Sequence, residues 1–213
     1  MEATMNPPTD SLPPWVPLIL DIPRPEKQSR LTNFPLGIGS FIRVVLAIPH
    51  FIVLSFLLLA AGVTGFLADF AILFTGKYPL GLFNFAVGAN RWAMNVLAYL
   101  AHLRDEYPPF SMDAGKYPVT YTVAYPATLN RFLNFPIFGV YIKGLLVIPH
   151  VIVLYVLLLV AYVLLFIATF AILFTGSFPA GMHRFVVGLA RWWSRVNIYG
   201  LSLTDEYPPF SLK

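Results

Sequence analysis

Two long apolar stretches dominate the pattern of hydrophobic and polar positions along the chain. Residues 51–74 contain a single charged residue, Asp69, and residues 151–174 contain none. A helix of roughly 24 residues reaches about 36 Å, which is enough to cross a bilayer hydrocarbon core of about 30 Å. The pattern therefore predicts two strongly apolar, membrane-spanning helices.

A shorter apolar run precedes each long stretch, at residues 36–47 and 137–147, and each run carries one cation. About 12 residues are too few to cross a bilayer, so we expect a separate, short interfacial helix in each case. The word Ile-Pro-His follows both runs. Proline lacks a backbone donor and suits the first turn of a helix, so Pro49 and Pro149 are expected to start or kink the long helix.

A third kind of stretch, at residues 81–103 and 181–203, is mostly apolar but carries a polar seam. Steps of three, four and seven residues place the members of this seam on one helical face. In the first stretch they are Asn84, Gly88, Arg91, Asn95 and His102, and in the second Arg184, Gly188, Arg191, Arg195 and Ser202. Such a helix either spans the membrane with its seam turned inward or lies in the interface with its arginines among phosphates. We favour spanning, which gives four transmembrane helices.

Two short segments outside these stretches have strand character. Residues 119–125 alternate and are rich in β-branched side chains, and residues 18–22 are their counterpart. The two segments are expected to pair into a small cytoplasmic β-ribbon that ties the two halves of the chain together.

The chain is an internal repeat with a period of 100 residues. More than half of the positions from Gly39 to Met112 are identical to those one period later, and Asp-Glu-Tyr-Pro-Pro-Phe-Ser recurs whole at 105–111 and 205–211. Shared hydrophobicity cannot produce such polar and proline-rich identities. We therefore divide the chain into an N-terminal tail (1–15) and two membrane repeats (16–112 and 113–213) of an all-α integral membrane protein.

Orientation follows from the spanning interpretation and from the basic residues. If two helices per repeat span, both repeats face the same way, and most cations lie on the side of the termini and the central linker. If the seam helix lies flat instead, each repeat crosses once and the two repeats are inverted. Lys77 is the exception. The positive-inside rule then predicts a multi-pass protein with both termini in the cytoplasm.

Composition agrees with a membrane protein and excludes several other classes. Hydrophobic residues make up 58% of the chain and charged residues 11%, against about 25% charged in soluble domains. The net charge of +4 is small and scattered, which argues against nucleic acid as a partner. The chain has no cysteine, which excludes disulfides and cysteine-ligated metal sites.

The repeated words resemble a known family. Ile-Pro-His, then Phe-Thr-Gly-x-x-Pro, Phe-x-Val-Gly-x-x-Arg-Trp and Asp-Glu-Tyr-Pro-Pro-Phe-Ser resemble bacterial membrane proteins catalogued only as a domain of unknown function. The resemblance covers residues 16–212. It implies a bacterial cytoplasmic (inner) membrane location, and it carries over no activity and no catalytic residue.

The repeat also pairs two histidines, His50 and His150. Packed about a two-fold axis, their imidazoles could face each other and hold a haem iron, or one could ligate the magnesium of a chlorophyll-type pigment. The simpler interpretation, which we favour, is that each histidine caps the helix that begins at the neighbouring proline and lies at headgroup level. We therefore predict no cofactor and no metal.

The repeated acidic and proline-rich word allows three interpretations. Paired carboxylates can bind Ca²⁺ or act as acid and base, but here they follow a helix and precede a stiff Pro-Pro step. We favour a solvated helix end with aromatic anchors, which also offers a docking loop for another protein. The residues of this loop are Asp105, Glu106, Tyr107, Pro108, Pro109 and Phe110, and Asp205, Glu206, Tyr207, Pro208, Pro209 and Phe210.

The arginines of the seam are the most informative charges, because a charge in mid-membrane costs about 2.5–3.5 kcal/mol unless it finds a partner. Asp69 is the nearest candidate for Arg91, but its repeat position is Thr169, so it is not a shared partner. We expect contact with anionic lipid or with another subunit at Arg91, Arg184, Arg191 and Arg195. Asp69 itself could serve as a proton-relay carboxylate, although no matched His or Lys is evident beside it.

These patterns favour a non-enzymatic membrane protein, an accessory or scaffold subunit of a larger membrane complex. The sequence has no phosphate-binding loop, dinucleotide turn, zinc-protease motif or nucleophile elbow. Two alternatives stay open: a small oligomeric transporter or channel for anions along the seam, and a haem- or pigment-binding subunit using His50 and His150. The expected partners are the lipid bilayer and other membrane subunits.

Overall fold

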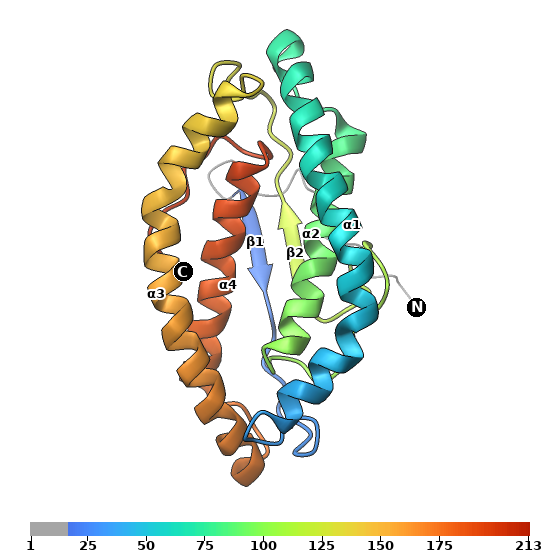
Figure 1. Ribbon diagram of the computed structural model, residues 1–213, viewed down its shortest axis with the longest axis vertical. Coiled ribbons are helices and arrows are strands. Elements are labelled where there is room, and N and C mark those ends of the chain that lie inside the picture. The colour runs from blue at the N-terminus through green and yellow to red at the C-terminus, as the bar shows by residue number, and fades with distance from the viewer. Residues whose placement is uncertain (1–16) are drawn as a thin grey trace.

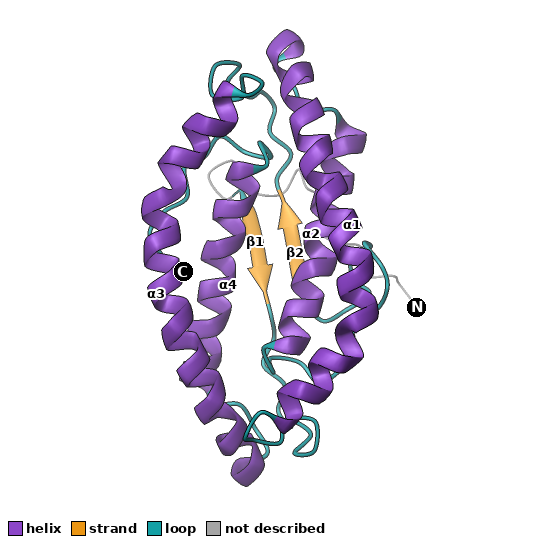
Figure 2. Ribbon diagram, in the orientation of Figure 1, coloured by secondary structure: helices purple, strands orange, loops and turns teal. Residues whose placement is uncertain are grey.

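The computed structural model describes residues 17–213, so the N-terminal tail predicted at 1–15 lies outside the described residues. Four helices and two short strands form two similar halves (Figures 1 and 2). The elements in chain order are β1 (Leu18–Asp21), α1 (Ile38–Thr75), α2 (Leu80–Leu100), β2 (Thr120–Val123), α3 (Phe138–Thr175) and α4 (Ala180–Gly200).

Each long helix is a single element of 38 residues. The prediction of a separate short interfacial helix is therefore wrong: the first apolar run and the long stretch are continuous, and Pro49 and Pro149 lie inside α1 and α3. A proline in a helix interior removes one backbone hydrogen bond and crowds the preceding turn. Each helix nevertheless continues through its proline as one element.

The shorter helices α2 and α4 pack against the long ones, α2 on α1 and α4 on α3. Gly76 and Gly176 end the long helices in the left-handed conformation, with φ of 72° and 76°. Pro79 and Pro179 then precede the first turns of α2 and α4. The repeated Thr-Gly-x-x-Pro word therefore sets the sharp turns between α1 and α2 and between α3 and α4.

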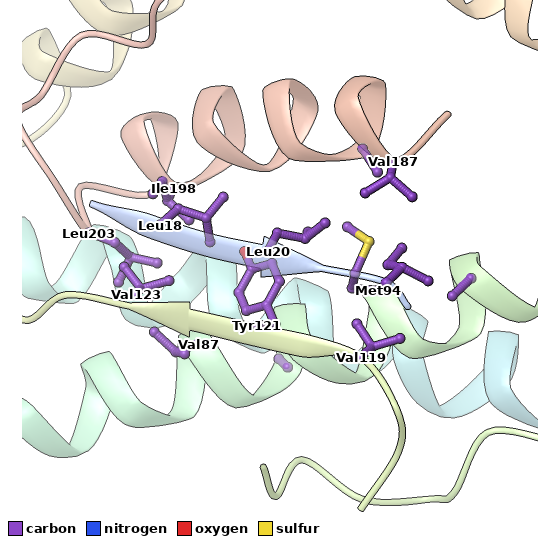
Figure 3. Close-up of a cluster of buried hydrophobic side chains, with 14 of the residues drawn as sticks. Leu18, Leu20, Val87, Met94, Val119, Tyr121, Val123, Val187, Ile198 and Leu203 are labelled. Carbon is purple, nitrogen blue, oxygen red and sulfur yellow. The ribbon is translucent and has the colours of Figure 1, made fainter. Parts of the chain in front are cut away.

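The predicted ribbon is present. Strands β1 and β2 pair antiparallel, with Leu18 opposite Val123 and Leu20 opposite Tyr121. Their buried side chains pack against residues of α2 and α4, among them Val87 and Ile198 (Figure 3). Each strand packs on a helix of the other repeat: β1, from the first repeat, packs on α4 of the second, and β2, from the second repeat, packs on α2 of the first.

The two repeats run in opposite directions. In Figure 1, α1 rises from the lower end of the molecule to the upper end, whereas α3 descends. Backbone bonds agree, since Gln28 donates to the carbonyl of Gly176 (2.8 Å) and Leu129 to that of Gly76 (2.8 Å). The expectation that both repeats face the same way is therefore wrong, and so is its premise about charge: the basic segments before α1 and before α3 lie at opposite ends.

Helices α1 and α3 are long and apolar enough to cross a membrane, and within the described residues they are the only two helices that pass this test. A narrow stripe of each helix is buried, including Ala47, Leu54 and Ile72 in α1. Most of their large apolar side chains are exposed instead, for example Phe41, Phe56 and Phe74. Exposed apolar surface along a whole helix marks an interaction face rather than a soluble exterior.

Candidate functional site

The repeated words Ile-Pro-His, Arg-Trp and Asp-Glu-Tyr-Pro-Pro-Phe meet in one aromatic pocket per repeat. In the first repeat, Trp92 Nε1 donates to His50 Nδ1 at 3.0 Å. Phe110 stacks on the imidazole with ring centroids 4.0 Å apart, and Tyr107 lies 5.0 Å from it. The acidic and proline-rich loop thus folds back onto the long helix of its own repeat.

The second repeat builds the same pocket with nearly the same geometry. Trp192 donates to His150 at 2.9 Å, Phe210 stacks at 3.8 Å and Tyr207 lies 4.9 Å away. The outer side chains of this loop keep part of their surface free, since Tyr107 and Tyr207 are each 45% exposed. Pro108 and Pro208 are buried, and the neighbouring acids Glu106 and Glu206 are exposed.

Tyr107 and Tyr207 each bind the turn of a long helix that contains the proline. The Tyr107 hydroxyl donates to the carbonyl of Leu46 at 2.9 Å, and the Tyr207 hydroxyl donates to that of Leu146 at 2.9 Å. A proline leaves the carbonyl four residues earlier without its helical donor, which is Val45 for Pro49 and Leu145 for Pro149. Each tyrosine therefore binds the neighbouring carbonyl of the same turn, and joins the acidic and proline-rich loop to the long helix about 60 residues earlier.

The two histidines are not brought together. Each is fully buried beside the tryptophan of its own repeat, and α1 and α3 lie on opposite sides of the molecule (Figure 1). Neither histidine caps a helix start, because both helices begin a dozen residues earlier. With Nδ1 accepting from the indole, the proton of the neutral ring is on Nε2, which has no hydrogen-bond partner in either pocket. No cluster of three or more His, Cys, Asp or Glu residues forms between residues 17 and 213.

The shared arginines of the seam bind the edges of the β-ribbon. Arg91 donates to the carbonyls of Tyr121 (3.0 Å) and Met112 (2.8 Å). Arg191 donates twice to Leu20, at 3.0 and 3.1 Å, and once to Leu212. Leu20 and Tyr121 are paired across the ribbon, so the arginines satisfy the outward carbonyl on both edges.

The other two arginines of the predicted site are placed differently. Arg195 donates to the carbonyls of Ser211 and Lys213 and so holds the C-terminal segment on α4. Arg184 is exposed. Three of the four arginines thus hold segments of their own chain, and a continuous row of free guanidinium groups is not formed along α2 and α4.

A buried cation anchors the start of each long helix. Arg43 is fully buried and donates to Asp105 Oδ1 (2.5 Å), Asn33 Oδ1 (2.8 Å) and the carbonyls of Thr32, Tyr99 and Arg104. This cluster joins the loop before α1, the first turns of α1 and the end of α2. A buried arginine whose donors are all engaged in this way is a structural anchor.

The corresponding cluster in the second repeat has different chemistry. Lys143 donates to Asn134 Oδ1 at 2.5 Å and to Ser202 Oγ at 3.2 Å, and lies 4.0 Å from Asp205. Asp69, from α1 of the first repeat, also faces Lys143 and Ser202. Asp69 is buried, and its Oδ1 has no hydrogen-bond partner. Asp69 thus faces a lysine of the other repeat rather than Arg91, and the sequence did not reveal this.

His102 marks a second difference between the clusters. It takes a positive φ of 58° after α2, and its ring lies 2.7 Å from Asn33 Oδ1 and 2.8 Å from Ser40 Oγ. Burial lowers the pKa of His102 to about 4, and the nearby Arg43 charge acts in the same direction. Ser202 occupies this place in the second repeat, with the same φ of 58°.

Sequence reasoning missed several residues of these pockets and clusters. Trp92 and Trp192 were seen only within a repeated word, and Asn33 and Asn134 were not singled out. Their repetition was the available signal, because a polar residue retained at both positions of an apolar repeat is expected to have a buried partner. Asp69 gave no such signal, since it occurs once.

The comparisons with known proteins give a family and no relative of known role. The family described as "Domain of unknown function (DUF4389)" matches the chain twice, at residues 38–112 and 139–211. These two matches cover most of the chain, one on each helical hairpin, so the chain belongs to this family as a tandem pair. No curated protein and no solved structure matches it.

Proposed function

We propose that this tandem DUF4389 protein is an integral membrane protein that acts through contact, as a non-enzymatic accessory or scaffold subunit of a larger membrane assembly. The proposal is supported by a contrast, among the described residues, between polar side chains that are bound within the chain and apolar side chains that are exposed. His50, His102 and His150 and most of the arginines and aspartates are hydrogen-bonded within the chain, whereas α1 and α3 present exposed apolar side chains along their length.

Lipid is the first partner that this surface favours. Phe41, Phe56 and Phe74 are 69%, 69% and 76% exposed, and Phe174 on α3 is 76% exposed. Removing one such side chain from water is favourable by about 1.5–3 kcal/mol, so the full set provides a strong drive into a bilayer. A protein subunit is the second partner, because the exposed apolar face exceeds what a soluble monomer usually carries.

Photocrosslinking tests the accessory role. A photoreactive phenylalanine analogue at Phe56 or Phe166, on the exposed face, is expected to give one discrete protein adduct in native membranes. The matched control is the same analogue at Lys77, in the exposed turn between α1 and α2, where no adduct of that mass is expected. Lipid adducts alone at every position on α1 and α3 would contradict the accessory role and leave membrane embedding intact.

Membrane extraction tests embedding separately. The protein is expected to stay in the pellet after an alkaline carbonate wash and to leave it only in detergent. A monodisperse protein in the supernatant without detergent would overturn the proposal as a whole.

A further inference from the structure

Three properties of the apolar face bear on how it meets a membrane: its length, its shape and what lies behind it. Helices of 38 residues are about 57 Å long, nearly twice the hydrocarbon thickness of about 30 Å. Their exposed apolar side chains continue to both ends, with Ile38 and Phe74 at the two ends of α1 and Phe138 and Phe174 at those of α3. Fitting this length across a bilayer needs a tilt of about 60°, beyond the usual range of about 0–40°.

The polar parts of the molecule lie beside the middle of the long helices rather than at their ends. The ribbon β1–β2 lies at mid-length, and the C-terminus is also near the middle of the long axis (Figure 1). Exposed polar side chains on or next to the ribbon include Asp21, Thr120, Asp113 and Lys116. If α1 and α3 crossed a bilayer lengthwise, these charges and this irregular backbone would lie at the depth of the acyl chains, where lipid-exposed loops do not occur.

The contacts between elements place the polar ribbon behind the apolar face. Strand β1 touches α4 and strand β2 touches α2, whereas the main contacts of α1 and α3 are with α2 and α4. The order of layers is therefore long helices, then short helices, then ribbon. The amphipathic character belongs to the assembled fold, which explains why each long helix alone is apolar on nearly every side.

We infer that α1 and α3 lie flat in one leaflet, antiparallel and at the two edges of one face of the molecule, with the ribbon and the C-terminal segment in water. The inference rests on the proposed membrane embedding and specifies its geometry. In this geometry α1 and α3 do not cross the membrane, and their broad apolar face enters the bilayer from one side. Flat embedding places the whole 57 Å of both helices in lipid and leaves no polar loop in the hydrocarbon.

A cavity on α3 fits the same geometry. It has a volume of about 370 Å³ and is lined by apolar residues of α2, α3 and α4, including Leu154, Ala190 and Trp193. Tyr155 and Leu158 belong both to this lining and to the exposed surface of α3. The cavity is thus continuous with the apolar face, and an acyl chain of the same leaflet is its expected occupant.

The absence of cysteine from the chain makes a labelling test clean. Single variants Lys27→Cys and Lys77→Cys probe exposed positions at opposite ends of the long helices, and Lys116→Cys probes the ribbon side. In sealed vesicles of one orientation, an impermeant maleimide is expected to label all three from the same side. Phe56→Cys, on the apolar face, is the protected control and is expected to react from neither side.

Two results would overturn the inference, and they differ from each other. Labelling of Lys27→Cys and Lys77→Cys from opposite sides would show that the long helices cross the membrane, with the embedding itself intact. Labelling of Phe56→Cys from water in intact vesicles would show that the face is not in lipid, which would also overturn the proposed function.

Discussion

The two ion clusters at the starts of the long helices occupy equivalent places in the repeats and differ in how they balance charge. In the first repeat, Arg43 is matched by one aspartate at 2.5 Å, beside a neutral His102. In the second repeat, Lys143 lies 4.0 Å from Asp205 and also faces Asp69, which comes from the opposite repeat. The first cluster is closed within its own repeat, and the second couples one repeat to the other.

The difference teaches that a repeat can keep a shape while it changes the chemistry that holds it. Arginine can bind five acceptors in a fixed fork and here uses backbone carbonyls as well as Asp105. Lysine carries a compact charge that tolerates longer contacts, so a second carboxylate can share it. The repeat counterpart of Asp69 is Thr169 and that of Lys143 is Arg43, so both positions differ between the repeats.

Removing one carboxylate from each cluster is the strongest way to break this comparison. Asp105→Asn leaves Arg43 buried without its counter-charge, so we expect a loss of about 3–5 kcal/mol in the free energy of unfolding. Asp205→Asn is expected to cost less than half of that, because Asp69 still faces Lys143. Thermal unfolding in detergent, followed by circular dichroism, measures both variants, and equal losses would contradict the comparison.

The pH dependence of stability is the next largest effect. The pKa of His102 is about 4 in the folded chain, below its ordinary value of about 6.5. As the pH falls from 6.5, the unfolded chain therefore takes up the proton first, and stability decreases until the pH reaches about 4. The decrease attributable to this group is about 3 kcal/mol. Stability is unchanged by this group above pH 6.5.

His102→Ser copies the second repeat and isolates that effect. The variant is expected to lose stability less steeply than the wild type between pH 6.5 and 4, with the two curves parallel above pH 6.5. Denaturant unfolding at a series of pH values in one detergent provides the comparison. Identical slopes for the two proteins would show that His102 does not titrate in this way.

The hydrogen bonds from Tyr107 and Tyr207 to the proline-containing turns should have the smallest effect on stability and the closest agreement between repeats. Tyr107→Phe and Tyr207→Phe each remove one hydroxyl that donates at 2.9 Å to a carbonyl in the turn that contains the proline. We expect each to lose about 0.5–1.5 kcal/mol, with the two values within error of each other. Thermal melts measure the loss, and Tyr162→Phe, an exposed tyrosine on α3, is the control expected to lose nothing.

Much of the fold follows from the sequence, and what does not follow depends on contacts between distant residues. The repeat and the long apolar helices are local patterns or identities, and both are present. The strand character of the two ribbon segments is local too, and their pairing was expected because they hold equivalent places in the two repeats. The continuity of α1 through Pro49 did not follow from the sequence, because a proline beside an apolar run suits a helix start as well as a kink. The opposite directions of the repeats were expected only if the seam helices lay flat, and the near-identical words did not decide between the two arrangements.

The candidate site shows the same limit more sharply. The repetition of these words singled out His50, Arg91 and the loop from Asp105 to Phe110 as residues kept in both repeats. The sequence did not show that these words bind one another, because each word alone resembles a lipid-facing or solvent-facing motif. The lysine that faces Asp69 belongs to the other repeat, so only the folded arrangement reveals that pair.

The depth profile along α1 tests the flat-embedded arrangement most directly. Phe41, Phe56 and Phe74 are similarly exposed and lie within about 60° of one another around the helix. Spin labels on single cysteines at these positions report their depth through collision with oxygen and with a water-soluble nickel chelate. Flat embedding predicts similar depths in one leaflet for all three labels. A deep label at position 56, with labels at 41 and 74 near opposite surfaces, would contradict it.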